Sequence, residues 1–199
     1  EGMTLAEHNS NKLLMPASNM KLISTGAALY HLGSDYRFRT EIAHDGKIED
    51  GVLKGNIYII GHGDPTLGSK DTLATELSSV FGEWEKAIRG AGIRSIEGCI
   101  VGDGRWIDGM MEEETWLWND IGTYYGSGVS RLNFYENMIS VNASIDASKT
   151  PEQVKLIQHY PSTSWMTIIQ NCTVGEKGSG DKLYMYTSDL APVAQIRGT

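Results

Sequence analysis

Glycine is unusually frequent in this chain, and so many glycines limit the length of its helices and strands. The 199 residues include 23 glycines, a share above the ~7% that is usual in proteins. Because glycine loses more conformational freedom on folding than other residues, it is disfavoured inside helices and strands and favoured in turns. We therefore expect short strands joined by tight turns, with a few helices. The fold class predicted is α+β and not a helical bundle.

The charge and hydropathy of the chain exclude several classes of partner. Its 17 basic and 25 acidic residues give a formal net charge of −8. Binding to nucleic acid or to an anionic membrane surface requires clustered Lys and Arg. The sequence has no apolar run near the ~18 residues of a membrane-spanning helix. We therefore expect no nucleic-acid partner and no transmembrane segment.

Neither a metal nor a cofactor is expected. The five histidines show no H-E-x-x-H or other ligand spacing. Segment 61–63 reads Gly-His-Gly after a predicted strand, but Thr66 breaks the dinucleotide fingerprint G-x-G-x-x-G. Cys99 and Cys172 are too few for a four-cysteine zinc site, and their apolar surroundings favour buried free thiols. A single disulfide is the alternative in an oxidising compartment.

Hydrophobic periodicity predicts the order of the elements. Apolar residues at helical spacing predict helices at 17–32 and 70–90. Alternating and apolar runs predict strands at 3–8, 36–43, 53–60 and 96–101. Residues 103–130 are expected to form a loop, in which Trp116 and Trp118 pack in the core. Beyond residue 137, short strand-like runs alternate with turns and predict a β-rich region.

The tetrapeptide Ser18-Asn19-Met20-Lys21 is the motif with the clearest chemical meaning. Residues i and i+3 lie on one face of a helix, so the serine hydroxyl and the lysine amine can meet. A serine becomes a nucleophile when a base removes its proton, and a lysine can be that base when burial or nearby cations leave it uncharged. Taken alone, Ser18 as a helix cap and Lys21 as a solvated side chain are the alternative. The same spacing at Ser179 and Lys182 lies in a turn-like stretch and is set aside.

The sequence around this motif resembles the active-site helix of penicillin-binding proteins. Segment 16–42, PASNMKLISTGAALYHLGSDYRFRTEI, is most similar to the class C low-molecular-mass type, the D-alanyl-D-alanine carboxypeptidase/endopeptidase family. The similarity continues in the family's order through DGVLKGNIYIIGHGDPTL, GIRSIEGCIVGDGRWID and WLWNDIGTYYGSGVSRLNFYENMISV. Several matched segments in order are far more specific than one tetrapeptide.

The resemblance implies a serine-type enzyme with Ser18 as the acylated nucleophile and Lys21 as the general base. Ser18 would attack the penultimate D-alanine of a peptidoglycan stem peptide that ends in D-Ala-D-Ala, and water would then release the acyl group. β-Lactams would trap the same serine. Asp120 and Tyr125 match the acidic and aromatic residues that meet the free amino group of the peptide's diamino acid. An ordinary loop carboxylate is the alternative for Asp120.

The resemblance also implies a division of the chain. Residues 1–40 would be the N-terminal part of a serine-transpeptidase/β-lactamase-like domain, with the S-x-x-K helix. Residues 41–199 would form the inserted domain or domains, β-rich with one long helix. The family's K-[TS]-G motif is absent from the sequence, and Ser140-Val141-Asn142, which spells S-x-N, lies in a predicted strand and is interpreted as a coincidence.

These departures lead to an expectation about the whole protein. The chain would be the front portion of a longer periplasmic enzyme, without the C-terminal half of its own catalytic domain, and would hydrolyse no D-Ala-D-Ala peptide alone. A non-catalytic module that binds cell-wall peptides is the alternative function. In that case Ser18 and Lys21 would be vestigial.

Overall fold

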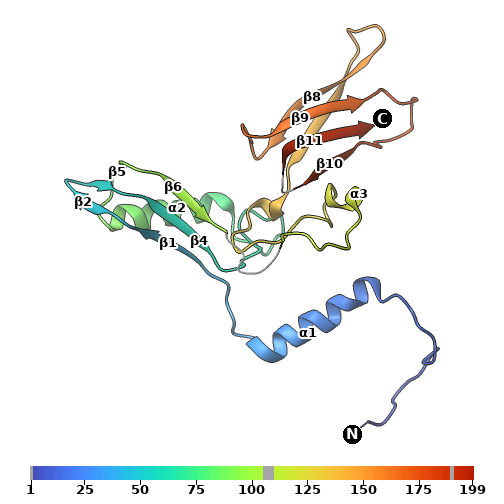
Figure 1. Cartoon of the computed structure of the whole chain (residues 1–199), viewed down its shortest axis with the longest axis horizontal. Coiled ribbons are helices and arrows are strands. Elements are labelled where there is room, and N and C mark those ends of the chain that lie inside the picture. The colour runs from blue at the N-terminus through green and yellow to red at the C-terminus, as the bar shows by residue number, and fades with distance from the viewer. Residues whose placement is uncertain (1, 105–109, 189–190) are drawn as a thin grey trace. The chain divides into compact units, whose positions relative to one another are not determined.

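The computed structural model describes residues 2–104, 110–188 and 191–199, and the chain divides into two compact units, residues 1–37 and 38–199. The first unit holds η1 (Ala17–Asn19) and α1 (Met20–Leu32). The second unit contains the remaining elements (Figure 1), which are β1 (Thr40–His44), β2 (Lys47–Glu49), β3 (Val52–Lys54), β4 (Ile57–Gly61), α2 (Leu77–Gly90), β5 (Ser95–Ile96), β6 (Ile100–Asp103), α3 (Trp118–Ile121), η2 (Tyr135–Asn137), β7 (Ser140–Asp146), β8 (Gln153–Tyr160), β9 (Thr167–Cys172), β10 (Tyr184–Ser188) and β11 (Ala191–Gly198). The α+β class predicted from the sequence is confirmed.

The helix predicted at 17–32 forms as one 3-10 turn followed by α1. It ends at Gly33, whose φ of 80° is a conformation that glycine adopts without strain. Every described residue of α1 is exposed, including the apolar residues Leu22, Leu29 and Leu32. The strand predicted at 3–8 is wrong, because the described part of the chain offers those residues no pairing partner.

Two three-stranded sheets and α2 form the first part of the second unit. The strand orders are β1-β4-β6 and β2-β3-β5, and each sheet combines an antiparallel pair with a parallel pair. Leu53, Ile57 and Ile93 are buried together, and Ile88 of α2 packs against them. Burial of such side chains contributes about 1.5–3 kcal/mol each to folding. This core holds α2 to the sheets.

Glycine breaks each of the two strands predicted at 53–60 and 96–101 into two shorter ones. A Cβ atom on Gly55 would lie 2.6 Å from Gly46 Cα, and a Cβ on Gly98 would overlap the carbonyl oxygen of Gly55. Three segments of chain therefore touch here through backbone atoms, with no room for a side chain. The regular hydrogen bonding between strands therefore stops at these glycines and resumes beyond them.

Where the strands are interrupted, hydrogen bonds from side chains take the place of the backbone hydrogen bonds between strands. Asp45 accepts hydrogen bonds from the backbone N–H of Asn56 (2.7 Å), from Asn56 Nδ2 (3.1 Å) and from the hydroxyl of Tyr58 (2.7 Å). Asn56 Oδ1 in turn accepts from the backbone N–H of Cys99 (3.0 Å). The bond from Tyr58, followed by those from Asn56, holds the pKa of the Asp45 carboxyl below its ordinary value. The network depends on Asp45 being ionised.

Protonation of Asp45 is therefore expected to destabilise the fold. A group whose pKa is lower in the folded than in the unfolded chain stabilises the fold above its unfolded pKa, and this stabilisation is lost as the pH falls through the folded pKa. We expect the free energy of unfolding of the wild-type chain to fall on acidification below about pH 4, and to fall less in Asp45→Asn. Urea unfolding at several pH values measures this. The control is Asp50→Asn on the adjacent turn, and equal pH dependence in Asp45→Asn and wild type would contradict the assignment.

The β-rich region predicted beyond residue 137 is confirmed. β7 and β8 form an antiparallel pair, and a second sheet has the order β10-β11-β9, with β11 parallel to β9. β8 was not predicted from the sequence. Ala194 and Ile196 of β11 are buried within this region.

Several local predictions need correction. The strand predicted at 36–43 begins only at Thr40. The helix predicted at 70–90 begins at Leu77, because Asp71 accepts the backbone N–H of Leu73 (2.8 Å) and holds a turn there. The loop predicted at 103–130 contains the short helix α3, and its residues 105–109 lie outside the described residues.

Four side chains predicted to be buried behave differently. Trp118 is 63% exposed and lies against Tyr186, with 5.2 Å between ring centroids, and Trp116 is 36% exposed. Both cysteines are free, as expected, but Cys99 is exposed and Cys172 is only half-buried. Cys99 follows directly on Gly98, so it lies at the strand break and not inside a strand.

Candidate functional site

Ser18 and Lys21 meet at the start of the helix in the first unit. Lys21 Nζ donates a hydrogen bond to Ser18 Oγ at 3.1 Å. The 3-10 turn of η1 places Ser18 one turn before Lys21, so the side chains lie on one face. The preceding residue, Ala17, has a φ of 45°, which is uncommon for a residue with a Cβ. The chain therefore turns sharply immediately before the serine.

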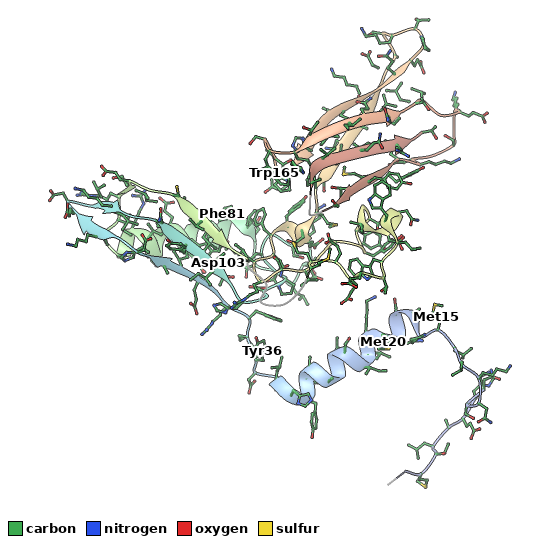
Figure 2. All side chains as sticks on the ribbon, viewed as in Figure 1. Met15, Met20, Tyr36, Phe81, Asp103 and Trp165 are labelled. Atoms are coloured by element: carbon green, nitrogen blue, oxygen red, sulfur yellow. The ribbon has the colours of Figure 1, made fainter. Side chains whose placement is uncertain are left out.

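The neighbouring hydroxyl groups of the same helix form hydrogen bonds to the backbone instead. Ser24 Oγ donates to the carbonyl oxygen of Met20 at 3.1 Å, and Thr25 Oγ1 donates to that of Lys21. Met20, the first residue of α1, projects from its N-terminal end in Figure 2. Of these three hydroxyl groups, that of Ser18 is the one in contact with an amine.

The surroundings of the pair are open to solvent. Ser18 and Lys21 are both exposed, and the amine donates to the hydroxyl. A base must instead accept the hydroxyl proton, which requires an uncharged amine, and burial favours that form. The backbone N–H of Asn19 is bonded to the carbonyl oxygen of Pro16 (3.0 Å), so this group is already satisfied. The two side chains have the geometry of a Ser/Lys dyad, but they are exposed to solvent and not buried.

Asp120 and Tyr125 meet in the second unit, at α3 and the turn that follows it. The Tyr125 hydroxyl donates to Asp120 Oδ1 at 3.3 Å. Tyr124 lies edge-on to the Tyr125 ring, with 5.2 Å between centroids. A Cβ on Gly126 would overlap the carbonyl oxygen of Asp120, so glycine is required for this tight turn. A carboxylate beside exposed aromatic rings suits an ammonium group.

The four predicted site residues thus form two pairs, one in each unit. Among the described residues, no three His, Cys, Asp or Glu side chains are grouped so that they could hold a metal ion. The described helices include none with the length and apolar character to span a bilayer. One further contact was not predicted: Lys70 Nζ donates to Ser140 Oγ at 3.1 Å. The two residues are 70 positions apart, so no local spacing could indicate it.

A Ser-x-x-Lys pair is one of the motifs that penicillin-binding proteins share with class A β-lactamases. The model of the D-Ala-D-Ala carboxypeptidase 3 (S13) family matches residues 1–188, and the chain belongs to this family. It is a low-molecular-mass penicillin-binding protein sequence, as its resemblance predicted.

Two curated relatives have carboxypeptidase names. The chain is 31% identical over 224 residues to the D-alanyl-D-alanine carboxypeptidase of Actinomadura sp. (strain R39), which covers 98% of this chain. It is 28% identical over 154 residues to the D-alanyl-D-alanine carboxypeptidase DacB of Haemophilus influenzae, which covers 77% of this chain. The chain spans 38% of the length of the first relative and 30% of the second.

Solved structures show the same fold. Penicillin-binding protein 4 (dacB) from Haemophilus influenzae matches with a TM-score of 0.70 and 23% identity, over 97% of this chain and 40% of that protein. The same protein in complex with a novel β-lactam matches with a TM-score of 0.62 and 22% identity, over 97% of this chain and 37% of that one.

Proposed function

We propose that this chain carries the nucleophile of a serine-type D-alanyl-D-alanine carboxypeptidase/endopeptidase that acts on peptidoglycan stem peptides in the periplasm. The observation that carries the proposal is the 3.1 Å contact between Lys21 Nζ and Ser18 Oγ. The names of the relatives support the substrate class, since both are D-alanyl-D-alanine carboxypeptidases. The η1–α1 segment would supply the reacting groups.

The proposed reaction has two steps. An uncharged Lys21 amine takes the hydroxyl proton while Ser18 Oγ attacks the carbonyl carbon of the penultimate D-alanine. The peptide bond breaks, and the terminal D-alanine leaves with the proton from Lys21. Water then attacks the acyl carbon and gives its proton to Lys21. As the bond to Ser18 Oγ breaks, Lys21 passes this proton to Ser18 Oγ, which restores both groups. With a β-lactam, the leaving nitrogen stays tethered to the acyl group, so the acyl-enzyme persists.

The exposure of the pair determines where this reaction can occur. Ser18 and Lys21 are both exposed, whereas a lysine that acts as a base needs surroundings that favour its uncharged form. We propose that the apolar face of α1, with Leu22, Leu29 and Leu32, is covered in the complete gene product, and that this cover also buries the amine. The 199-residue chain alone would then hydrolyse no D-Ala-D-Ala peptide at a useful rate.

Asp120 and Tyr125 are proposed to bind the free amino group of the diamino acid in the stem peptide. An ammonium group would replace the Tyr125 hydroxyl as the donor to the carboxylate, at little cost because that bond is long. The two exposed rings of Tyr124 and Tyr125 would lie beside the charge.

Asp120→Asn is expected to lower kcat/KM of the complete gene product by about 10- to 100-fold for peptides with the free amine, the loss of one charged hydrogen bond. For the same peptide with the amine acetylated, the variant and the wild type should have equal kcat/KM. Glu114→Gln, an exposed carboxylate in the same loop, is the matched control and should change neither value. A loss of equal size on both peptides would show that Asp120 acts on stability and not on the amine.

Labelled penicillin tests the proposed function in the complete gene product. We expect one covalent label per chain, found by mass spectrometry on the tryptic peptide 13–21, which contains Ser18 as its only serine. Binding of the D-Ala-D-Ala peptide with no covalent label would instead establish the non-catalytic binding module. A label on another peptide would remove Ser18 from the mechanism.

A further inference from the structure

Three side chains from two segments that are distant in the sequence meet at the start of β7. Ser140 Oγ accepts a hydrogen bond from Lys70 Nζ at 3.1 Å and lies 3.4 Å from the Tyr135 hydroxyl. Lys70 Nζ also lies over the Tyr135 ring, 4.9 Å from its centroid. Lys70 precedes α2, Tyr135 is in η2, and Ser140 begins β7. All three belong to the second unit, whereas Ser18 and Lys21 belong to the first.

The turn that carries Tyr135 is strained. Tyr135, Glu136 and Asn137 have φ values of 52°, 58° and 53°, three consecutive left-handed residues, none of which is glycine. Such backbone persists only where surrounding contacts hold it, and it is concentrated at functional sites. Asn137 Nδ2 supplies two of these contacts, to the carbonyl oxygen of Gly128 and to Asn133 Oδ1, both at 2.8 Å.

The strained turn is tied to the lysine segment by its own carboxylate. Glu136 Oε1 accepts from Ser69 Oγ at 2.7 Å and from the backbone N–H of Lys70 at 3.1 Å. These bonds leave the Lys70 amine free to reach Ser140. The contacts thus hold the phenol and the amine close to one hydroxyl group.

We propose that Ser140 is a second nucleophilic serine of this chain, which takes an acyl group from small carboxylic esters. Tyr135 accepts the hydroxyl proton, and the Lys70 ammonium stabilises the negative charge that develops on the attacked group. The roles differ from those at Ser18, because Lys70 is exposed and acts as a cation, not as a base.

The charges around Tyr135 favour this role. Hydrogen bonds from Ser140 and Lys70, and the charge of Lys70, hold the pKa of the Tyr135 phenol below its ordinary value, although burial and the charge of Glu136 act in the opposite direction. The other titratable group in contact is Tyr160 of β8, whose ring lies edge-on to that of Tyr135 with 4.8 Å between centroids. More phenolate is therefore present at mildly alkaline pH than for a free tyrosine.

A fluorophosphonate probe gives a stable form of the same step. Ser140 Oγ forms a bond to phosphorus, the phosphorus–fluorine bond breaks, fluoride leaves, and the hydroxyl proton passes to the Tyr135 phenolate. With an ester, the bond forms to the carbonyl carbon and the alkoxide or phenoxide leaves. No oxidant or further reactant is required.

The experiment treats the 199-residue chain with the probe and locates the adduct by fragmenting the tryptic peptide 132–149, which also contains Ser144 and Ser148. We expect the adduct on Ser140 in the wild type, its loss in Ser140→Ala, and no change in Ser144→Ala, a half-buried serine of the same strand. Absence of the adduct from wild-type Ser140, or an equal adduct on this peptide in Ser140→Ala, would overturn the proposal.

The pH dependence of the rate of adduct formation shows whether Tyr135 acts as a base or has only a structural role. In the wild type the rate should rise between about pH 7 and about pH 10 and then level. In Tyr135→Phe it should be at least about tenfold lower without that rise. Equal rates and profiles would remove Tyr135 from the mechanism. Because Ser18→Ala should keep the Ser140 adduct, failure of penicillin capture at Ser18 and failure of this proposal are distinguishable.

Discussion

A Ser18→Ala variant of the complete gene product is expected to lose covalent capture of labelled penicillin entirely. The acyl group needs an oxygen nucleophile, and the methyl group of alanine provides none. Lys21→Met, which keeps the length of the side chain and removes the amine, should slow capture by about 10²- to 10⁴-fold, the usual contribution of a general base. Gel fluorography of the labelled protein over time measures both effects.

The same helix offers a matched control. Ser24 is exposed like Ser18, but its hydroxyl donates to the carbonyl oxygen of Met20. Ser24→Ala should therefore capture penicillin at the wild-type rate. If Ser18→Ala kept its label while Ser24→Ala lost it, the nucleophile would have been assigned to the wrong turn of the helix.

Gly98→Ala is expected to be strongly destabilising. The new Cβ would overlap the carbonyl oxygen of Gly55 and lie 3.1 Å from Asn56 Oδ1. Because the obstacle is backbone, it cannot rotate away, and the strands must separate. The cost should be on the order of 3 kcal/mol in the free energy of unfolding, the upper part of the range for overpacking. Chemical denaturation measures it.

Gly82→Ala is the control for this change. A Cβ on Gly82 in α2 would meet no heavy atom within 4 Å, and alanine favours helix over glycine by about 1 kcal/mol. The two variants make the same chemical change and should alter stability in opposite directions. A Gly98→Ala chain as stable as the wild type would show that the three glycines do not limit the packing of the strands.

Local patterns were sufficient for the features that depend on neighbours in sequence. The helix at 17–32 and the contact between Ser18 and Lys21 follow from spacing within one or two helical turns, and both are present. The pairing of Asp120 with Tyr125 came from the family resemblance, and the two side chains do meet.

Features that depend on distant residues could not be predicted in this way. The strand breaks at Gly55 and Gly98 arise where three segments cross, and no window of sequence contains all three. Lys70 and Ser140 meet only because the loop before α2 and the start of β7 are brought together by the turn at Glu136. Periodicity reports which face of an element is apolar, and not which element it will meet.

The two lysine–serine contacts have the same length, 3.1 Å, yet they should respond differently when the protein opens. The one at Ser18 is closed by a single helical turn, whereas the one at Ser140 closes a loop of 70 residues and bears the corresponding entropy. Partial melting of the second unit would separate Lys70 from Ser140, which are held together by contacts within that unit. The chemical reactivity of Ser140 would thus report whether the second unit is folded. Ser18 belongs to the first unit and cannot report this.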